Sequence, residues 1–84
     1  MDQFRTKDIY EASALIAAKA RFLHLLPDKH FYWFVFEDCD NCRQISDSYW
    51  RNELKVMAKD LTEAIRTMKD KIHSNNQYDA MKKL

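Results

Sequence analysis

The chain has 84 residues, of which 46% are hydrophobic and 32% charged, so it is long enough for one small domain and too apolar for a disordered chain. Fourteen basic and thirteen acidic residues leave a formal charge of +1, which argues against a general polyanion binder but allows a local basic patch. Glycine is absent, which excludes a glycine-rich phosphate loop and predicts few turns with positive φ.

The N-terminal segment MDQFRTKD is polar and lacks the apolar core of a signal peptide. No apolar run approaches the roughly 20 residues that a membrane-spanning helix needs. The two cysteines lie three positions apart, so they cannot connect distant parts of the chain. These features predict a cytoplasmic protein with reduced thiols and no membrane partner.

The first predicted element is a helix from about residue 9 to about residue 20, where alanine and leucine are frequent. Asp8 and Glu11 have the spacing of a capping box, with Asp8 as the N-cap and Glu11 at the third helical position. An apolar stripe on one side of this helix is formed by Ile9, Ala12, Ile16 and Ala20.

A β-hairpin is predicted next. Residues 22–26 read as one strand, LPDK at 26–29 as the turn, and FYWFVF at 31–36 as the returning strand. Side chains alternate along a strand, so the second strand presents large apolar or aromatic residues on both faces. A lone hairpin is not stable in water and must be covered.

Two interpretations of that cover remain open. In the first, helices of the same chain pack on both faces of the hairpin. In the second, another copy of the chain covers one face or pairs with the strand edge, since an aromatic edge strand invites pairing. We expect the second arrangement, a homodimer with Phe31, Trp33 and Val35 at its interface.

Two helices complete the chain. Asp38 or Asp40 is predicted to cap a helix that runs to about Trp50, and a break is expected at residues 51–55, where the apolar stripe loses phase. A third helix is expected at about residues 57–73, with a narrow apolar stripe.

The element order is therefore α-β-β-α-α, which predicts the α+β class: a two-stranded antiparallel hairpin packed by three helices. A single domain is expected over residues 1–74, followed by a polar, frayed tail over residues 75–84.

Four segments, FRTKDIYEAS, YWFVFED, SYW and LTEAIRTMKDKI, together resemble a family of small uncharacterised domains from bacterial, prophage and mobile-element genomes. Those domains follow F-x-T-K-D-[IL]-Y, F-V-F-E-D, Y-[WF] and A-[IL]-R-x-[LM]-K-D-x-I, and the resemblance covers roughly residues 4–73. It implies a phage or mobile-element accessory protein of unknown function and no catalytic residue. This chain has Asn52 where such domains usually have a small residue.

The motif CDNC at residues 39–42 invites two chemical hypotheses. A C-x-x-C pair before a helix is typical of redox thiols, but the neighbouring acids disfavour a thiolate. A zinc site is the better hypothesis, with its nitrogen and sulfur ligands drawn from His24, His30, Cys39 and Cys42. The alternative is that Cys42 is an ordinary core thiol, and we expect no cofactor.

Nucleic-acid binding is the second functional class. A basic stripe on the third predicted helix consists of Lys55, Lys59, Arg66 and Lys69. Acidic residues interleave with it, as on any solvated helix face. Further basic residues near the first helix are Arg5, Lys7, Lys19 and Arg21. Basic side chains close to exposed aromatics such as Tyr32 or Trp33 would bind single strands by stacking and backbone contact.

No catalytic site is predicted, because the acids at residues 37–40 are better explained as caps of the following helix. Arg43 and Arg51 would suit a small anionic ligand such as a nucleotide in a dimer groove. The sequence therefore predicts a small, non-enzymatic, homodimeric binding module that docks onto or sequesters an unidentified protein. Its alternatives are the nucleic-acid accessory protein and the nucleotide-binding groove.

Overall fold

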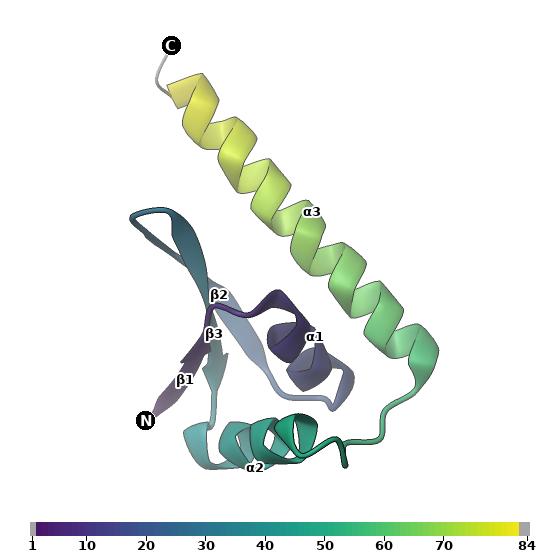
Figure 1. The fold of residues 1–84 in the computed structure, drawn as a ribbon. Coiled ribbons are helices and arrows are strands. Elements are labelled where there is room, and N and C mark those ends of the chain that lie inside the picture. The colour runs from purple at the N-terminus through teal and green to yellow at the C-terminus, as the bar shows by residue number, and fades with distance from the viewer. Residues whose placement is uncertain (1, 83–84) are drawn as a thin grey trace.

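The computed structural model describes the chain from residue 2 to residue 82, and its side chains to residue 75 (Figure 1). The described residues form six elements: β1 (Gln3–Thr6), α1 (Ile9–Ala17), β2 (Phe22–Asp28), β3 (Phe31–Glu37), α2 (Cys39–Trp50) and α3 (Ala58–Lys82). The predicted α+β class, with a β-hairpin packed by helices, is confirmed. No helix in this part of the chain is long and apolar enough to cross a bilayer.

The sheet contains a strand that the sequence analysis lacked. β1 pairs antiparallel with β3, which makes the strand order β1-β3-β2. The aromatic strand β3 is therefore central, and the expectation that it offers a free edge is wrong. The segment QFRT contains one apolar residue, too few to show the alternation by which strands are recognised.

The helices pack on one face of the sheet, which we call the covered face. Figure 1 places α1 between the sheet and α3. The buried centre of the core combines residues from β3 and from all three helices: Ala12, Leu15, Phe34, Phe36, Cys42 and Met68. Phe4, Phe22 and Leu25 extend this cluster across the other two strands.

Helix α1 begins as predicted but ends earlier. The backbone N–H groups of Tyr10 and Glu11 donate to the Asp8 carboxylate at 2.8 and 3.0 Å, which confirms Asp8 as the N-cap. The reciprocal half of the capping box is absent, because the Asp8 N–H donates to the Thr6 hydroxyl instead, at 3.1 Å. The helix ends at Ala17 rather than at about residue 20.

Although glycine is absent, three residues adopt positive φ: Lys19 at 71°, Asp38 at 66° and Asn52 at 63°. Lys19 follows the C-cap of α1 and Asn52 that of α2. After each helix the backbone makes the paired hydrogen bonds of a Schellman motif, such as Ala20 N–H to the Leu15 carbonyl at 2.9 Å. The chain thus ends two helices with left-handed residues that usually favour glycine.

The last two helices follow the prediction up to the C-terminus. Asp38 caps α2, which ends at Trp50, so the predicted break at residues 51–55 is confirmed. Helix α3 starts one residue later than expected and runs to Lys82, so most of the segment predicted as a frayed tail is helical. Residues 83 and 84 of that segment lie outside the described residues.

Candidate binding site on the open face of the sheet

The face of the sheet opposite the helices is the candidate site, and we call it the open face. Strand alternation and pairing place together Arg5 of β1, Phe31, Trp33 and Val35 of β3, and His24, Leu26 and Asp28 of β2. Lys7, just after β1, reaches the same face. None of these residues belongs to the core cluster of the described chain.

The centre of the open face is an aromatic pair covered by cations. The rings of Phe31 and Trp33 meet edge to face, with centroids 5.2 Å apart. The guanidinium carbon of Arg5 lies 5.5 Å from the Trp33 ring centroid, and the Lys7 ammonium lies 5.3 Å from that of Phe31. Both distances are within the range of a cation–π interaction. Two half-buried rings therefore carry positive charge directly over them.

Asp28 fixes the orientation of the Trp33 ring from the β2 side. The Trp33 Nε1–H donates to one carboxylate oxygen of Asp28 at 3.1 Å, and the Lys29 backbone N–H donates to the other at 2.8 Å. The Lys29 backbone bond, followed by the Trp33 bond and the positive charge of Arg5, lowers the pKa of Asp28. The carboxylate is therefore ionised at neutral pH.

The residues predicted for a dimer interface differ in accessibility. Phe31 and Trp33 are half-buried, and Leu26, which pairs with Trp33, is 38% exposed. Val35 is 1% exposed in the single chain and lies between Arg5 and His24 on the neighbouring strands. Val35 therefore has almost no surface left to offer a partner.

The basic stripe predicted on the third helix is less concentrated than its sequence suggests. Lys55 precedes α3 and does not belong to it. Lys59, Arg66 and Lys69 are exposed on α3. Two acids lie within one helical turn of Arg66, Glu63 on one side and Asp70 on the other, and they oppose its field.

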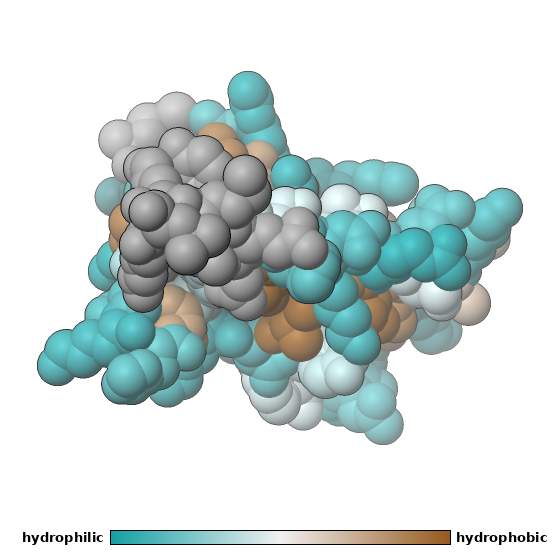
Figure 2. All heavy atoms as spheres, turned by 90° about the horizontal axis from the view of Figure 1, so that it is seen from above, coloured by the Kyte–Doolittle hydropathy of each residue, from teal (hydrophilic) through white to brown (hydrophobic). Residues whose placement is uncertain are grey.

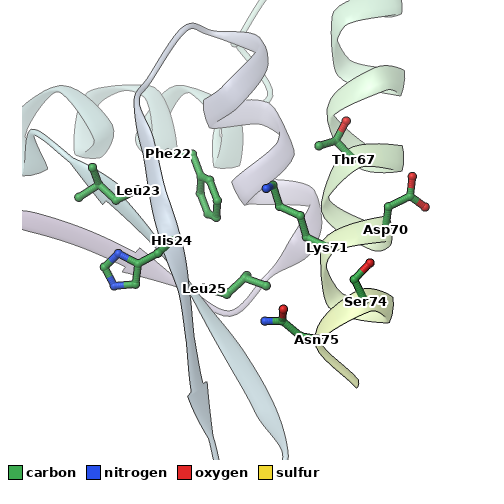
Figure 3. A pocket seen from close by; sticks show the side chains of 9 residues that line it. All are labelled: Phe22, Leu23, His24, Leu25, Thr67, Asp70, Lys71, Ser74 and Asn75. Atoms are coloured by element: carbon green, nitrogen blue, oxygen red, sulfur yellow. The ribbon is translucent and has the colours of Figure 1, made fainter. Parts of the chain in front are cut away.

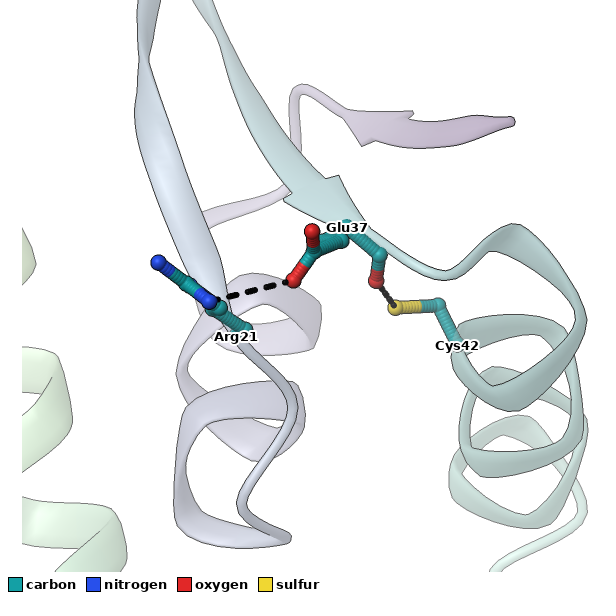
Figure 4. Close-up of polar contacts among 3 residues, drawn as sticks. All are labelled: Arg21, Glu37 and Cys42. Atoms are coloured by element: carbon teal, nitrogen blue, oxygen red, sulfur yellow. Dashed lines mark hydrogen bonds and ion pairs between the residues drawn. The ribbon is translucent and has the colours of Figure 1, made fainter. Parts of the chain in front are cut away.

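The four residues predicted for zinc do not converge. Cys42 is fully buried under the covered face, and its Sγ–H donates to the Glu37 carbonyl at 3.3 Å (Figure 4). His24 lies on the open face, and His30 is in the hairpin turn at the far end of β3 from Cys39. Within the described residues, no three His, Cys, Asp or Glu side chains are grouped to hold a metal ion.

Cys42 is also a poor nucleophile. Burial, followed by the nearby charges of Asp38 and Cys39, raises the pKa of its thiol to about 11. The thiolate is the reactive form of cysteine, so this thiol is inert at neutral pH. The structure thus places Cys42 as a core thiol, the alternative considered from the sequence.

The arginines considered for an anionic ligand lie apart. Arg43 and Arg51 are separated by about 12 Å along α2, given the rise of an α-helix. The Arg51 Nε lies 3.5 Å from a Glu53 carboxylate oxygen, and both side chains are exposed. The Arg51 guanidinium already has a carboxylate partner, and the anionic-ligand site stays a prediction.

A second concave region lies between the edge strand β2 and α3. This groove of about 600 Å³ is lined by the β2 segment 22–25 and by polar residues of α3 (Figure 3). Seen from the end of the molecule that holds the hairpin turn, apolar atoms reach the surface between hydrophilic side chains (Figure 2). The β2 edge is irregular, with a register shift between Phe22 and His24 and a proline at Pro27, and both features oppose the addition of a further strand.

The sequence analysis identified the aromatic pair but not its cations. Arg5 and Lys7 stood out as charges near the first helix, and their position over the rings depends on the pairing of β1 with β3. In QFRTK, Phe4 and Thr6 do alternate with Arg5 and Lys7, but with a single apolar residue this pattern is too short to identify a strand. Comparisons with protein-family models, with curated proteins and with solved structures find no match to the chain.

Proposed function

We propose that the protein is a non-enzymatic nucleic-acid-binding module that uses the open face of its sheet. One observation carries the proposal: two aromatic rings on a sheet face without helices each have a cation over them, Arg5 on Trp33 and Lys7 on Phe31. Flat bases and anionic phosphates are the two chemical groups of nucleic acids that such a surface recognises.

The location of the rings supports the proposal further. Phe31 and Trp33 lie on the central strand, so a ligand over them is also within reach of both neighbouring strands. Sheets with aromatic residues on a face free of helices bind RNA in this way elsewhere, and the analogy is one of architecture alone.

The small number of cations sets the expected strength of binding. Two phosphate contacts, to Arg5 and Lys7, predict that the logarithm of the affinity falls with the logarithm of salt concentration with a slope of about −1.4 for a single strand. Binding should therefore be weak and only moderately dependent on salt, in keeping with the net charge of +1.

The test is fluorescence anisotropy with a labelled oligonucleotide of mixed sequence, over about 50 to 300 mM salt. The double reversal Arg5→Glu with Lys7→Glu should abolish binding. The matched control, Lys59→Glu with Arg66→Glu on α3, changes the net charge by the same amount and should leave the affinity within about threefold of the wild type. Circular dichroism verifies that both variants are folded.

Each other outcome has a definite meaning. Equal loss in both variants would show that binding follows net charge and not the open face. Loss in the α3 variant alone would move the site to the basic stripe of that helix. Absence of binding by the wild type would refute the proposal.

Self-association through the same face is the second candidate, favoured by the 38% exposure of Leu26 beside Trp33. A face-to-face dimer would bring Arg5 and Lys7 of both copies into one interface, where like charges repel. Native mass spectrometry tests it: a wild-type dimer that Trp33→Lys converts to a folded monomer would support this candidate, and a wild-type monomer would remove it.

A further inference from the structure

We infer that the nucleic acid is an unpaired strand, whose phosphates lie on the β1 side of the open face and whose bases stack on Trp33 and Phe31. This inference rests on the proposed function and names the ligand class of the same site. It follows from the order of the three strands and from the kind of side chain that each brings to the face.

The phosphate side is set by the distribution of charge across the sheet. Arg5 and Lys7 approach the rings from the β1 side, and the ionised Asp28 borders them from the β2 side. An anionic backbone is attracted to the first side and repelled by the second. Since β3 lies between these strands, the bases of a bound strand fall over its rings, with their edges directed toward β2.

The rings require bases that are not stacked in a duplex. Phe31 and Trp33 are side chains on the surface of a sheet, and they contact base planes only when bases are unstacked. The two ring planes are inclined at 76° to each other with centroids 5.2 Å apart, so each ring can stack with one base and the pair takes about two bases. The Trp33 ring is held by Asp28, so it offers a preformed surface.

Binding requires Arg5 to adjust. Its guanidinium lies over the Trp33 ring, where a base would stack. Arg5 is exposed, and a guanidinium plane is itself a stacking partner for bases, so it can shift toward a phosphate or stay as a second layer. Neither movement disturbs the cluster that joins the sheet to the helices, because Arg5 does not belong to it.

A duplex fits this surface poorly. Double-stranded DNA carries one charge per about 1.7 Å, and its binding proteins neutralise many phosphates, whereas the rings have two cations over them. A two-stranded ribbon enters the major groove in some proteins, but here Asp28 and Lys29 at the tip of the β2–β3 hairpin carry opposite charges, so the tip has little net charge to attract phosphates.

The experiment compares an unpaired oligonucleotide of about 12 nucleotides with the duplex of the same sequence, by anisotropy and by quenching of tryptophan fluorescence. The unpaired strand should bind at least about tenfold more tightly and should quench fluorescence. Trp33→Leu should lose about tenfold in affinity together with the quenching. The matched control Trp50→Leu removes the other tryptophan, which is 61% exposed and bound to Glu11 on the helical side, and should keep both.

The outcomes separate this inference from the proposed function. Two outcomes would show that the protein binds nucleic acid at this face but not by stacking. One is that the duplex binds as tightly as the single strand. The other is that Trp33→Leu keeps its affinity and quenching while the Arg5 and Lys7 reversal abolishes binding. If neither oligonucleotide binds, the proposed function itself fails. The same sequence as RNA and as DNA identifies the source of the strand, and a preference for either supports the inference.

Discussion

The aromatic residues on the two faces of β3 differ in their burial and in the kind of side chain that surrounds them. Phe34 and Phe36 on the covered face are 1% and 0% exposed and pack against apolar residues of the helices. Phe31 and Trp33 on the open face are half-buried, and their neighbours are two cations and a carboxylate. The first pair stabilises the fold, whereas the second offers a surface on which charge and flat rings are available to a ligand.

The polar contacts differ between the faces as well. On the helical side, the buried carboxylate of Glu11 accepts hydrogen bonds from the Ser46 hydroxyl and from Trp50 Nε1, the latter at 2.8 Å. This contact joins α1 to α2 and holds the helical layer together. On the open face, Asp28 performs a local task, the positioning of one ring.

The largest expected effect tests this division directly. Phe36→Ala should lower the free energy of unfolding by about 3–5 kcal/mol, because it opens a cavity in the core. Phe31→Ala, on the other face of the same strand, should lower it by about 1 kcal/mol or less. Urea denaturation followed by circular dichroism measures both values. Similar losses for the two variants would mean that the open face is part of the stabilising core.

The Glu11 contact is the next target. Glu11→Ala leaves the Ser46 hydroxyl and the Trp50 indole N–H without their acceptor and should lower the free energy of unfolding by about 1–3 kcal/mol. Glu11→Gln keeps an acceptor oxygen and should lose less. Glu53→Ala removes a carboxylate that is exposed and should change stability by less than about 0.5 kcal/mol. A loss for Glu11→Ala no larger than for Glu53→Ala would show that the contact does not hold the helices.

A stabilising change of smaller size is expected at Lys19. Lys19→Gly removes the steric cost of a left-handed lysine after α1 and should raise the free energy of unfolding by up to about 1 kcal/mol. The ion pair with Asp60, 3.5 Å long and exposed, contributes little against this gain. Asn52→Gly should gain less, since asparagine tolerates the left-handed region. A loss of stability in Lys19→Gly would contradict the assigned backbone geometry.

The smallest effect is a dependence on alkaline pH. Because the pKa of Cys42 is raised to about 11, the native state holds the thiol proton more tightly than the unfolded state. The resulting stabilisation is complete below the unfolded pKa and is lost as the pH rises toward about 11. The melting temperature should fall more steeply between about pH 8 and pH 10.5 for the wild type than for Cys42→Ala. Parallel curves would mean that the thiol is accessible to solvent.

The sequence predicted the parts of the fold that depend on local signals. The proline-containing segment after residue 22, the Asp38 cap and the apolar stripe containing Ala64 and Met68 predicted the hairpin and the last two helices. The turn itself was placed too early: Pro27 and Asp28 continue β2 and pair with β3, and the turn residues are Lys29 and His30. β1 was missed because four residues carry no periodicity of their own, and their strand conformation depends on pairing with β3. The left-handed residues were missed because only glycine was considered for positive φ, although asparagine, as at Asn52, also tolerates it.

The candidate site was predictable in part for the same reason. Alternation along β3 placed Phe31 and Trp33 on one face, but it could not say which face the helices cover. Arg5 and Lys7, the cations over the rings, come from β1 and the residue just after it. Because the sequence analysis did not predict β1, it did not predict that these cations lie over the rings. Likewise, the hydrogen-bond partners of Glu11 are Ser46 and Trp50, which are distant in the sequence, so no local sequence pattern predicts the contact.

The most direct test of the open face is a titration of the protein with the unpaired oligonucleotide, followed in the nitrogen–proton correlation NMR spectrum. We predict that the shifted signals are those of the backbone amides of Arg5, Lys7 and the Phe31–Val35 segment, together with the indole N–H of Trp33, while the signals of α3 stay in place. Shifts concentrated on Lys59, Arg66 and Lys69, with the indole of Trp33 unmoved, would contradict the assignment of the binding surface to the open face.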